Sequence, residues 1–140
     1  MSSKKKVKME SLNEKARVLK NGSWKAKIKT IITIQEKGEK EFLKPLIEVA
    51  LKDENSYIRE EAVKALGELK DCSAVETLIR LLEDGNWGVR RQAAFSLGKL
   101  KDKRALEPLV KALDDGDYWV EKAAAKALGK IILFLVESDK

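Results

Sequence analysis

The chain has 140 residues and a mass of 15.8 kDa, the size of one ordinary domain. Charged residues make up 37% and hydrophobic residues 44%, with 2 Pro and 8 Gly, which is typical of a soluble helical protein rather than a disordered, collagen-like or membrane protein. Because the sequence has no His and a single Cys, His-based catalytic and metal sites, an intrachain disulfide and a four-cysteine zinc site are excluded.

The positive charge is concentrated in the first third of the chain. Residues 1–40 contain 12 Lys and Arg against 4 Asp and Glu, whereas residues 41–140 contain 17 against 19. Such a region attracts nucleic acid, acidic proteins or anionic lipid, although a solvated terminus explains it equally well. The candidate basic patch consists of Lys4, Lys5, Lys6, Lys8, Lys25, Lys27 and Lys29.

We expect residues 1–9 to be a disordered basic tail, followed by a first helix that begins near Leu12. Ser11 and Glu14 form a capping-box pattern at that point. The N-terminus lacks the apolar stretch of a secretory signal, and no apolar run is long enough to span a membrane. Together with the single Cys, this pattern predicts a cytoplasmic protein with no membrane contact.

From residue 53 onward the sequence repeats itself. Residues 53–69, 84–100 and 115–131 align at an offset of 31 residues, and each copy has the same apolar, Ala and Gly positions. A shorter apolar element precedes each copy, and residues 21–27 open a fourth, degenerate copy. The aligned positions are Ile58, Val89 and Val120, then Ala62, Ala93 and Ala124, then Leu66, Leu97 and Leu128, then Gly67, Gly98 and Gly129.

Each copy has the pattern of a short helix followed by a longer one, with Asp, Asn and Gly between them. The longer helices are predicted near residues 23–37, 56–70, 87–101 and 118–136, and no segment has the alternation of a strand. A two-helix unit cannot bury its apolar face alone, so the units must stack. We therefore predict an all-α solenoid of about four repeats in one domain over residues 10–140, with repeats near 10–40, 41–72, 73–103 and 104–140.

The longer helices have a second face opposite the core stripe. In residues 87–100, Val89 and Leu97 lie on the core face, whereas Trp87 and Phe95 fall nearly opposite. An aromatic residue stands within one position of the same helix start in all four copies. Exposed aromatic residues with flanking charges are typical of binding hot spots, although a Trp at a helix start also packs under a neighbouring turn. The candidate partner-binding residues are Tyr57, Trp87, Arg91, Phe95, Tyr118, Trp119 and Lys122.

The repeat resembles the HEAT class, in particular the short prokaryotic HEAT-like repeats related to phycobilisome lyases. The shared signature is Asp-x-x-x-x-Val-Arg-x-x-Ala-Ala-x-x-Leu-Gly-x-Leu, followed by Ala-Leu-Glu-Pro-Leu-Val-Lys-Ala-Leu. The resemblance implies a right-handed superhelix with the second helices on the concave face. It also implies a ladder between repeats made by the recurring residues Asp53, Asp84, Asp115, Arg59 and Arg90.

The predicted function is that of a non-enzymatic scaffold, which binds another protein through the concave face and has no catalytic residue, cofactor or metal. Nucleic-acid binding through the basic N-terminal third is the alternative.

The segment Ile131–Val136 is apolar on every side of its helix. We therefore expect its outward side to be covered by a partner chain, a second copy or the chain's own tail. Cys72 lies in a linker with no motif for an activated nucleophile. The composition, rich in Lys and Glu, also suits a thermophile.

Overall fold

The computed structural model describes residues 2–139, which contain eight α-helices and no strand. The helices are α1 (Ser3–Asn21), α2 (Trp24–Lys37), α3 (Leu43–Lys52), α4 (Ser56–Leu69), α5 (Val75–Leu81), α6 (Trp87–Leu100), α7 (Leu106–Ala112) and α8 (Tyr118–Ser138). The all-α prediction is confirmed, and the four predicted long helices match α2, α4, α6 and α8 within two residues at each end. None of the helices within residues 2–139 is long and apolar enough to cross a bilayer.

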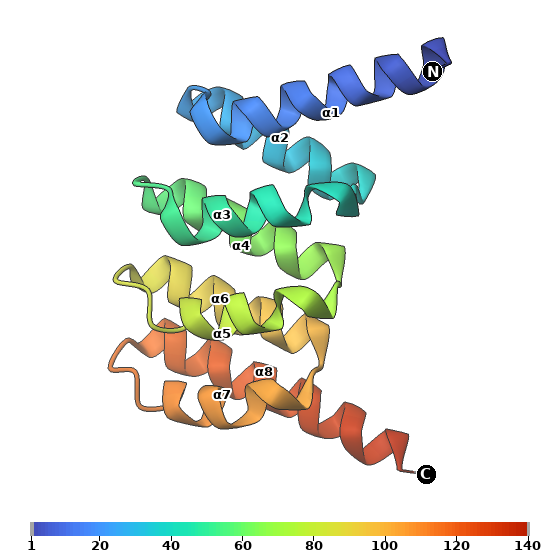
Figure 1. Ribbon diagram of the computed structural model, residues 1–140. Helices are drawn as coiled ribbons and strands as arrows, with labels where there is room; N and C mark the ends of the chain where they lie inside the picture. Colours follow the sequence, from blue (N-terminus) through green and yellow to red (C-terminus); the bar gives the residue numbers. More distant parts are fainter. Residues whose placement is uncertain (1, 140) are drawn as a thin grey trace.

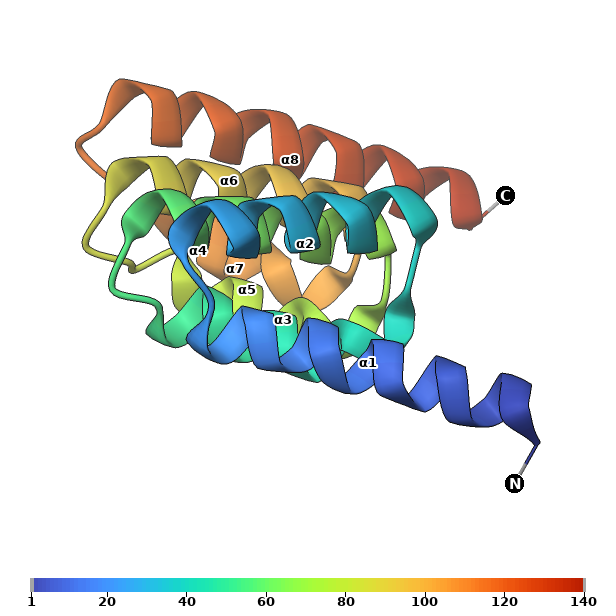
Figure 2. The ribbon, with the colours of Figure 1, turned by 90° about the horizontal axis from the view of Figure 1, so that it is seen from above.

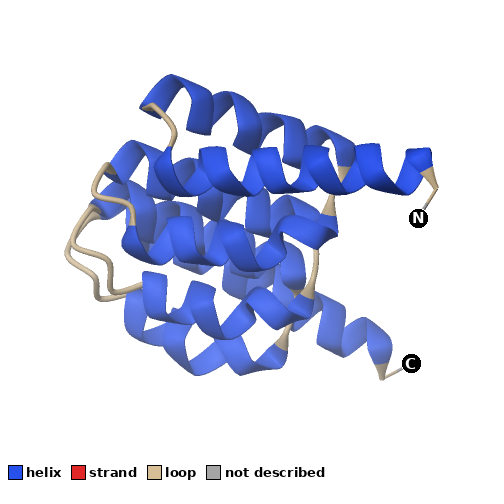
Figure 3. Cartoon of the chain, turned by 45° about the horizontal axis from the view of Figure 1, so that its top comes forward, coloured by secondary structure: helices blue, strands red, loops and turns tan. Residues whose placement is uncertain are grey.

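The helices form four pairs that stack in chain order, from α1 and α2 at one end to α7 and α8 at the other (Figure 1). Seen from above, the first helices of the pairs form one layer and the second helices form the other (Figure 2). The second helices α4, α6 and α8 pack against one another far more extensively than the first helices do. The connecting loops lie on two opposite edges of the stack (Figure 3).

The hydrophobic core runs between the two layers through the whole stack. Leu66, Leu97 and Ile131 are completely buried, each in a different second helix. The aligned Leu and Ala positions of the repeats supply most of the rest of this core, because the 31-residue period returns each of them to the same helix face. Burial of each Leu or Ile side chain contributes about 1.5–3 kcal/mol.

Small residues set the close spacing of the second helices. A Cβ atom at Gly67 would lie 2.5 Å from Ser96 Oγ, and one at Gly98 would lie 3.0 Å from Ala127 Cα. Ser96, which is buried, donates a hydrogen bond of 3.0 Å from Oγ to the carbonyl oxygen of Val63. Glycine at these two positions therefore lets α4, α6 and α8 approach one another.

An ion-pair ladder joins successive repeats along one edge. Arg59 donates from Nε and Nη2 to the two carboxylate oxygens of Asp84, at 3.0 Å each, and Arg90 holds Asp115 in the same way at 2.9 and 3.1 Å. Lys27 takes the Arg position in the first repeat, with Nζ 2.7 Å from Asp53 Oδ2. The predicted ladder is thus present, and it extends to the first repeat.

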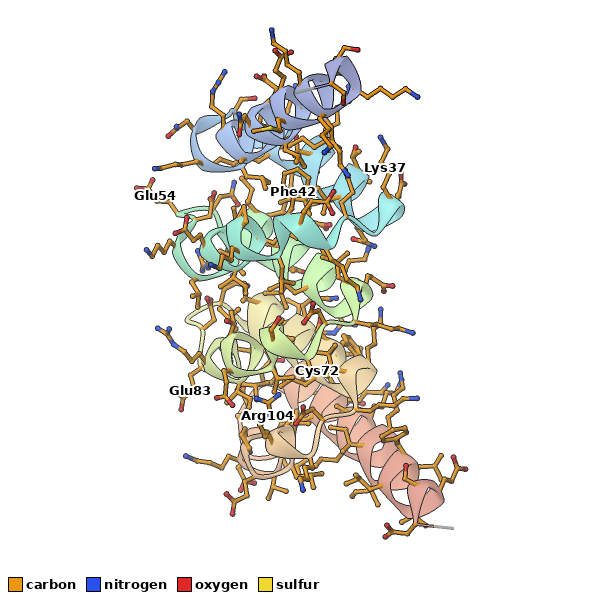
Figure 4. The ribbon with its side chains drawn as sticks, turned by 45° about the vertical axis from the view of Figure 1, so that its right-hand side comes forward. Lys37, Phe42, Glu54, Cys72, Glu83 and Arg104 are labelled. Atoms are coloured by element: carbon orange, nitrogen blue, oxygen red, sulfur yellow. The ribbon has the colours of Figure 1, made fainter. Side chains whose placement is uncertain are left out.

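The turns between paired helices share one capping arrangement. Asn55 and Asn86 precede α4 and α6, and their side chains accept hydrogen bonds from backbone N–H groups in the first turn of each helix. Asp117 does the same for α8. Figure 4 labels Glu54 and Glu83, which mark two of these turns on one edge. At the turns between successive repeats, Arg104 donates from Nη2 to the carbonyl oxygen of Cys72 at 3.2 Å.

The N-terminal segment differs from the prediction. Residues 3–9, expected as part of a disordered tail, form the first turns of α1, and the helix begins at Ser3 rather than near Leu12; Met1 lies outside the described residues. Ser2 caps the helix by accepting a hydrogen bond of 3.3 Å from the Lys5 amide. The residues that follow are good helix formers, so the helix extends past the packed part of α1 into solvent.

Candidate functional site

The row of aromatic residues predicted from the sequence lies at the starts of the second helices. Trp24, Trp87 and Tyr118 are the first residues of α2, α6 and α8, and Tyr57 is the second residue of α4. Together with Trp119, their side chains are between 47% and 63% exposed. The capped turns hold these residues in place, because each cap fixes where the helix begins.

Five of the predicted residues come together as an aromatic–basic cluster, formed by Arg91, Phe95, Tyr118, Trp119 and Lys122. The Arg91 guanidinium lies 5.0 Å from the centre of the Phe95 ring and 5.8 Å from the centre of the Trp119 ring, so it bridges α6 and α8. The Lys122 ammonium lies 5.6 Å from the Trp119 ring centre and 6.0 Å from that of Tyr118. The Tyr118 and Trp119 rings meet edge to face, with centroids 5.1 Å apart.

Arg91 is the centre of the cluster. Its Nε atom is buried and has no hydrogen-bond partner within the described chain. Phe95, expected on the outward face, is only partly exposed because its ring packs between the core and Arg91. A guanidinium that already contacts two aromatic rings loses little side-chain freedom when it binds a planar acceptor such as a carboxylate.

Glu60 on α4 extends the polar part of this surface. Partial burial, with a smaller contribution from the neighbouring Glu61 carboxylate, raises the pKa of Glu60, and the Arg91 charge opposes that shift. Its Oε2 atom lies close enough to α6 that a Cβ at Gly88 would be 2.9 Å away. Glu60, Arg91 and Lys122 occupy the same position in successive repeats, so the charge changes from negative to positive along the stack.

Trp87 and Tyr57 are placed differently from the cluster. Both side chains are about half exposed, at 47% and 49%, but neither is part of the ring and cation contacts described for the cluster. Both lie at starts of second helices on the same edge of the stack as Tyr118 and Trp119. The structure therefore brings together five of the seven predicted partner-binding residues and leaves these two as separate exposed rings.

The predicted basic patch is divided between both layers. Lys4, Lys5, Lys6 and Lys8 lie on the exposed N-terminal part of α1, whereas Lys25 and Lys29 are exposed on α2. The prediction that Lys27 belongs to the basic patch is wrong, because its ammonium forms the ion pair with Asp53 and its side chain is only 16% exposed. The physical reason is that Lys27 occupies the ladder position of the first repeat.

The sequence predicted none of the surface pockets, and two of them are lined mainly by residues of the repeats. One of about 650 Å³ lies beside α1 and α3, where Leu19 and Val49 are among its lining residues. The other, of about 390 Å³, is lined by Lys70, Lys101 and Phe134, among other residues at the carboxyl ends of the second helices. Within residues 2–139 no group of three His, Cys, Asp or Glu side chains is arranged to hold a metal ion.

Comparisons with known proteins agree with this architecture. One solved structure, "The structure of the complex of CpcE and CpcF of phycocyanin lyase from Nostoc sp. PCC7120", superposes with a TM-score of 0.75 at 27% sequence identity. The alignment covers 84% of this chain but 52% of that chain, so the protein spans about half the length of that relative. No match to a curated protein was found. The family model for HEAT repeats matches residues 15–94 and 75–137, and the chain therefore belongs to the HEAT-repeat family.

Proposed function

We propose that this protein is a non-enzymatic interaction module that binds another protein through the concave side of its solenoid, at the aromatic–basic cluster. The observation that carries the proposal is the arrangement around Arg91, whose guanidinium contacts both the Phe95 ring and the Trp119 ring. Folding alone does not require half-exposed rings to gather around an arginine. A partner that covers them gains apolar burial and a charge-assisted contact together.

The packing of the helices supports the concave location. The second helices pack closely through Gly67 and Gly98, whereas the first helices pack against one another much less. A stack whose two layers are unequally spaced curves toward the closer layer, which here is the layer of α4, α6 and α8. Trp119 and Arg91 belong to that layer, because they lie on α8 and α6.

The composition of the cluster supports a protein as partner. Trp, Tyr and Arg are the residue types that most often dominate the energy of protein interfaces. Loss of one central anchor typically costs at least about 2 kcal/mol, or roughly thirtyfold in affinity. The superposing structure from Nostoc is a complex of two proteins, CpcE and CpcF, which is consistent with a HEAT-like chain that works by assembly.

Nucleic-acid binding through the basic patch is supported less well. Lys27 is engaged by Asp53, and Lys15, another cation of the first third, is engaged by Glu39 at 2.7 Å. The remaining lysines lie on separate layers, although Lys25 stacks over the exposed Trp24 ring. Electrostatic binding to a phosphate backbone requires several cations that act on one strand path.

The test compares two tryptophans that are similarly exposed. Trp119→Ala removes the ring that Arg91 and Lys122 contact, whereas Trp24→Ala removes a ring at the matching helix start of the first repeat, outside the cluster. Proteins captured by the immobilised wild-type chain are quantified for each variant. A partner of the cluster is lost with Trp119→Ala and retained with Trp24→Ala, and its purified form binds the Trp119→Ala variant at least about thirtyfold more weakly.

Two outcomes would overturn the proposal. One is that every captured protein is retained equally by both variants, while circular dichroism shows that both are folded. The other is that labelled single-stranded or duplex oligonucleotides bind at low salt, with affinity that falls steeply as salt is added and disappears in the double variant Lys25→Ala, Lys29→Ala. The second result would favour the nucleic-acid function instead.

A further inference from the structure

A row of three lysines runs along the exposed side of α8. Lys122, Lys126 and Lys130 are spaced four residues apart, and all three are exposed. None of them forms an ion pair within residues 2–139. The helical rise places successive lysines of this row about 6 Å apart along the helix. The lysine row begins at the aromatic–basic cluster, of which Lys122 is a member.

The lysine row lies on a side of the solenoid that is open to solvent inside the stack as well. Arg91, Phe95 and Lys99 occupy the same three positions on α6, which lies between α4 and α8 (Figure 1). These three residues are nonetheless partly exposed. The Lys130 side chain leans over this side toward α6, because a Cβ added at Gly98 would lie 3.7 Å from its Cδ. The exposure of the lysine row therefore does not depend on α8 being the last helix.

The lysine row ends at the pocket of about 390 Å³ at the carboxyl ends of the second helices. The charged residues that line this pocket are Lys70, Lys99, Lys101, Lys130, Glu68 and Glu137. Lys99 is paired with Glu68, so three lysines without an ion pair in the described chain share the pocket with one carboxylate. The Lys101 ammonium lies 5.5 Å from the centre of the Phe134 ring. An anionic group that enters this pocket meets several cations beside an apolar ring.

Two of the pocket lysines have a backbone conformation that favours glycine. Lys70 and Lys101 have φ angles of 53° and 54°, and they are the only non-glycine residues with positive φ within residues 2–139. The matching position of the first repeat is Gly38, with a φ of 64°. A side chain in this conformation costs free energy that glycine avoids. Both lysines line the pocket, which is expected if their ammonium groups serve a ligand there.

We propose that the partner contributes an acidic segment in extended conformation, which lies along α8 from the aromatic–basic cluster to this pocket. The inference rests on the proposed function and specifies the chemistry of the partner. In an extended peptide, alternate side chains lie on one face about 6.4–6.8 Å apart. Carboxylates at every second residue therefore match the spacing of Lys122, Lys126 and Lys130. The sequence alone conceals this surface, because residues 41–140 contain 17 basic and 19 acidic residues.

An acidic peptide fits this surface better than a nucleic-acid strand does. Glu60 lies near enough to Arg91 for the two charges to interact, and Glu137 lines the pocket. A nucleic acid has a negative charge on every nucleotide, so a strand along this path would be repelled by both carboxylates. A peptide can place an uncharged residue opposite each of them.

Fluorescence anisotropy of labelled peptides with the full chain tests the proposal. The probe is a peptide in which glutamate alternates with serine, and the reference peptide has glutamine in place of glutamate. We expect the chain to bind only the glutamate probe, and the double variant Lys126→Ala, Lys130→Ala to bind it about tenfold more weakly because two ion pairs are lost. The matched control is Lys4→Ala, Lys8→Ala, which removes two exposed lysines of the same spacing from α1 and should leave binding unchanged.

A further variant separates binding from stability. Lys70→Gly removes one ammonium group of the pocket together with the unfavourable backbone conformation, so it should weaken binding of the glutamate probe without lowering the melting temperature. A lower melting temperature with unchanged binding would show that Lys70 serves the helix end, and would overturn the proposed path.

Three other outcomes would overturn the proposal. The glutamate probe does not bind, or it binds the Lys126→Ala, Lys130→Ala variant as tightly as the wild type. The third is that single-stranded oligothymidylate of the same charge binds more tightly than the peptide and loses affinity in that variant, which would assign the lysine row to nucleic acid. Capture of a protein that is lost with Trp119→Ala is a separate measurement, so the failure of the acidic segment is distinguishable from the failure of the proposed function.

Discussion

Two glycines at equivalent repeat positions should respond to alanine with opposite signs. Gly67 and Gly129 occupy the same position in α4 and α8, and both lie inside helices. An alanine methyl at position 67 would lie 2.5 Å from Ser96 Oγ and 2.9 Å from Ser96 Cα, so the backbone of α6 must move. At position 129 the methyl would have open space.

The magnitudes follow from two opposing contributions. Alanine in place of glycine in a helix interior stabilises the folded state by about 1 kcal/mol. Overpacking at a close helix contact costs about 1–3 kcal/mol. We therefore expect Gly129→Ala to raise the free energy of unfolding by about 1 kcal/mol, and Gly67→Ala to change it by between zero and a loss of about 2 kcal/mol.

Urea unfolding followed by circular dichroism measures both values. The experiment uses a chain concentration low enough to keep the copies apart, because any association would add its own free energy to that of folding. The m-values of the two variants should match that of the wild type, which shows that both changes act on the native state. If Gly67→Ala were as stabilising as Gly129→Ala, α4 and α6 would not be packed through Gly67 and the deduced spacing of the second helices would be wrong.

Two further predictions concern charged side chains. Arg90→Ala leaves the Asp115 carboxylate, which is only 10% exposed, without its arginine partner and should lower the free energy of unfolding in urea by about 1–3 kcal/mol. The control Arg17→Ala removes an exposed ion pair with Glu14 and should lower it by less than about 0.5 kcal/mol. Equal losses in the two variants would contradict a structural role for the ladder. Glu60→Gln should raise the melting temperature near pH 7 and lose that advantage at about pH 3, because the raised pKa of Glu60 means that its ionised form is disfavoured by folding and its protonated form is not. A melting-temperature difference that persists unchanged at the lower pH would show that burial of the Glu60 charge is not the cause.

The fold was predictable because its information is local and repeated. The 31-residue offset places Ala62, Ala93 and Ala124 on one helix face, and the Asp and Asn residues before each long helix mark its start. Each repeat supports the interpretation of the others, so an error at one helix boundary has little effect on the predicted fold. At Ser3 this support is missing, because the N-terminal part of α1 has neither a repeat counterpart nor an apolar stripe, and its helix was not predicted.

The candidate site was only partly predictable. Helix periodicity put Trp87, Arg91 and Phe95 on one face, and the repeat offset put Tyr118 at the position matching Trp87. Nothing in those patterns shows that Arg91 reaches Trp119 on the next second helix, at 5.8 Å, while Trp87 is outside the cluster. That outcome depends on side-chain directions and on the distance between α6 and α8, which Gly98 and Ala127 determine through their packing.

The sequence by itself therefore determined the helices of the repeats, their order and the face that each turns to the core, because these follow from the period and from capping residues within one turn. Only the tertiary structure decided which lysines are free and which are engaged. Lys27 belongs to a basic run in the sequence, yet it lies 2.7 Å from Asp53, a residue 26 positions away on the next repeat. Such pairs depend on how stacked repeats align in space, and contacts between repeats form only once the helices have packed.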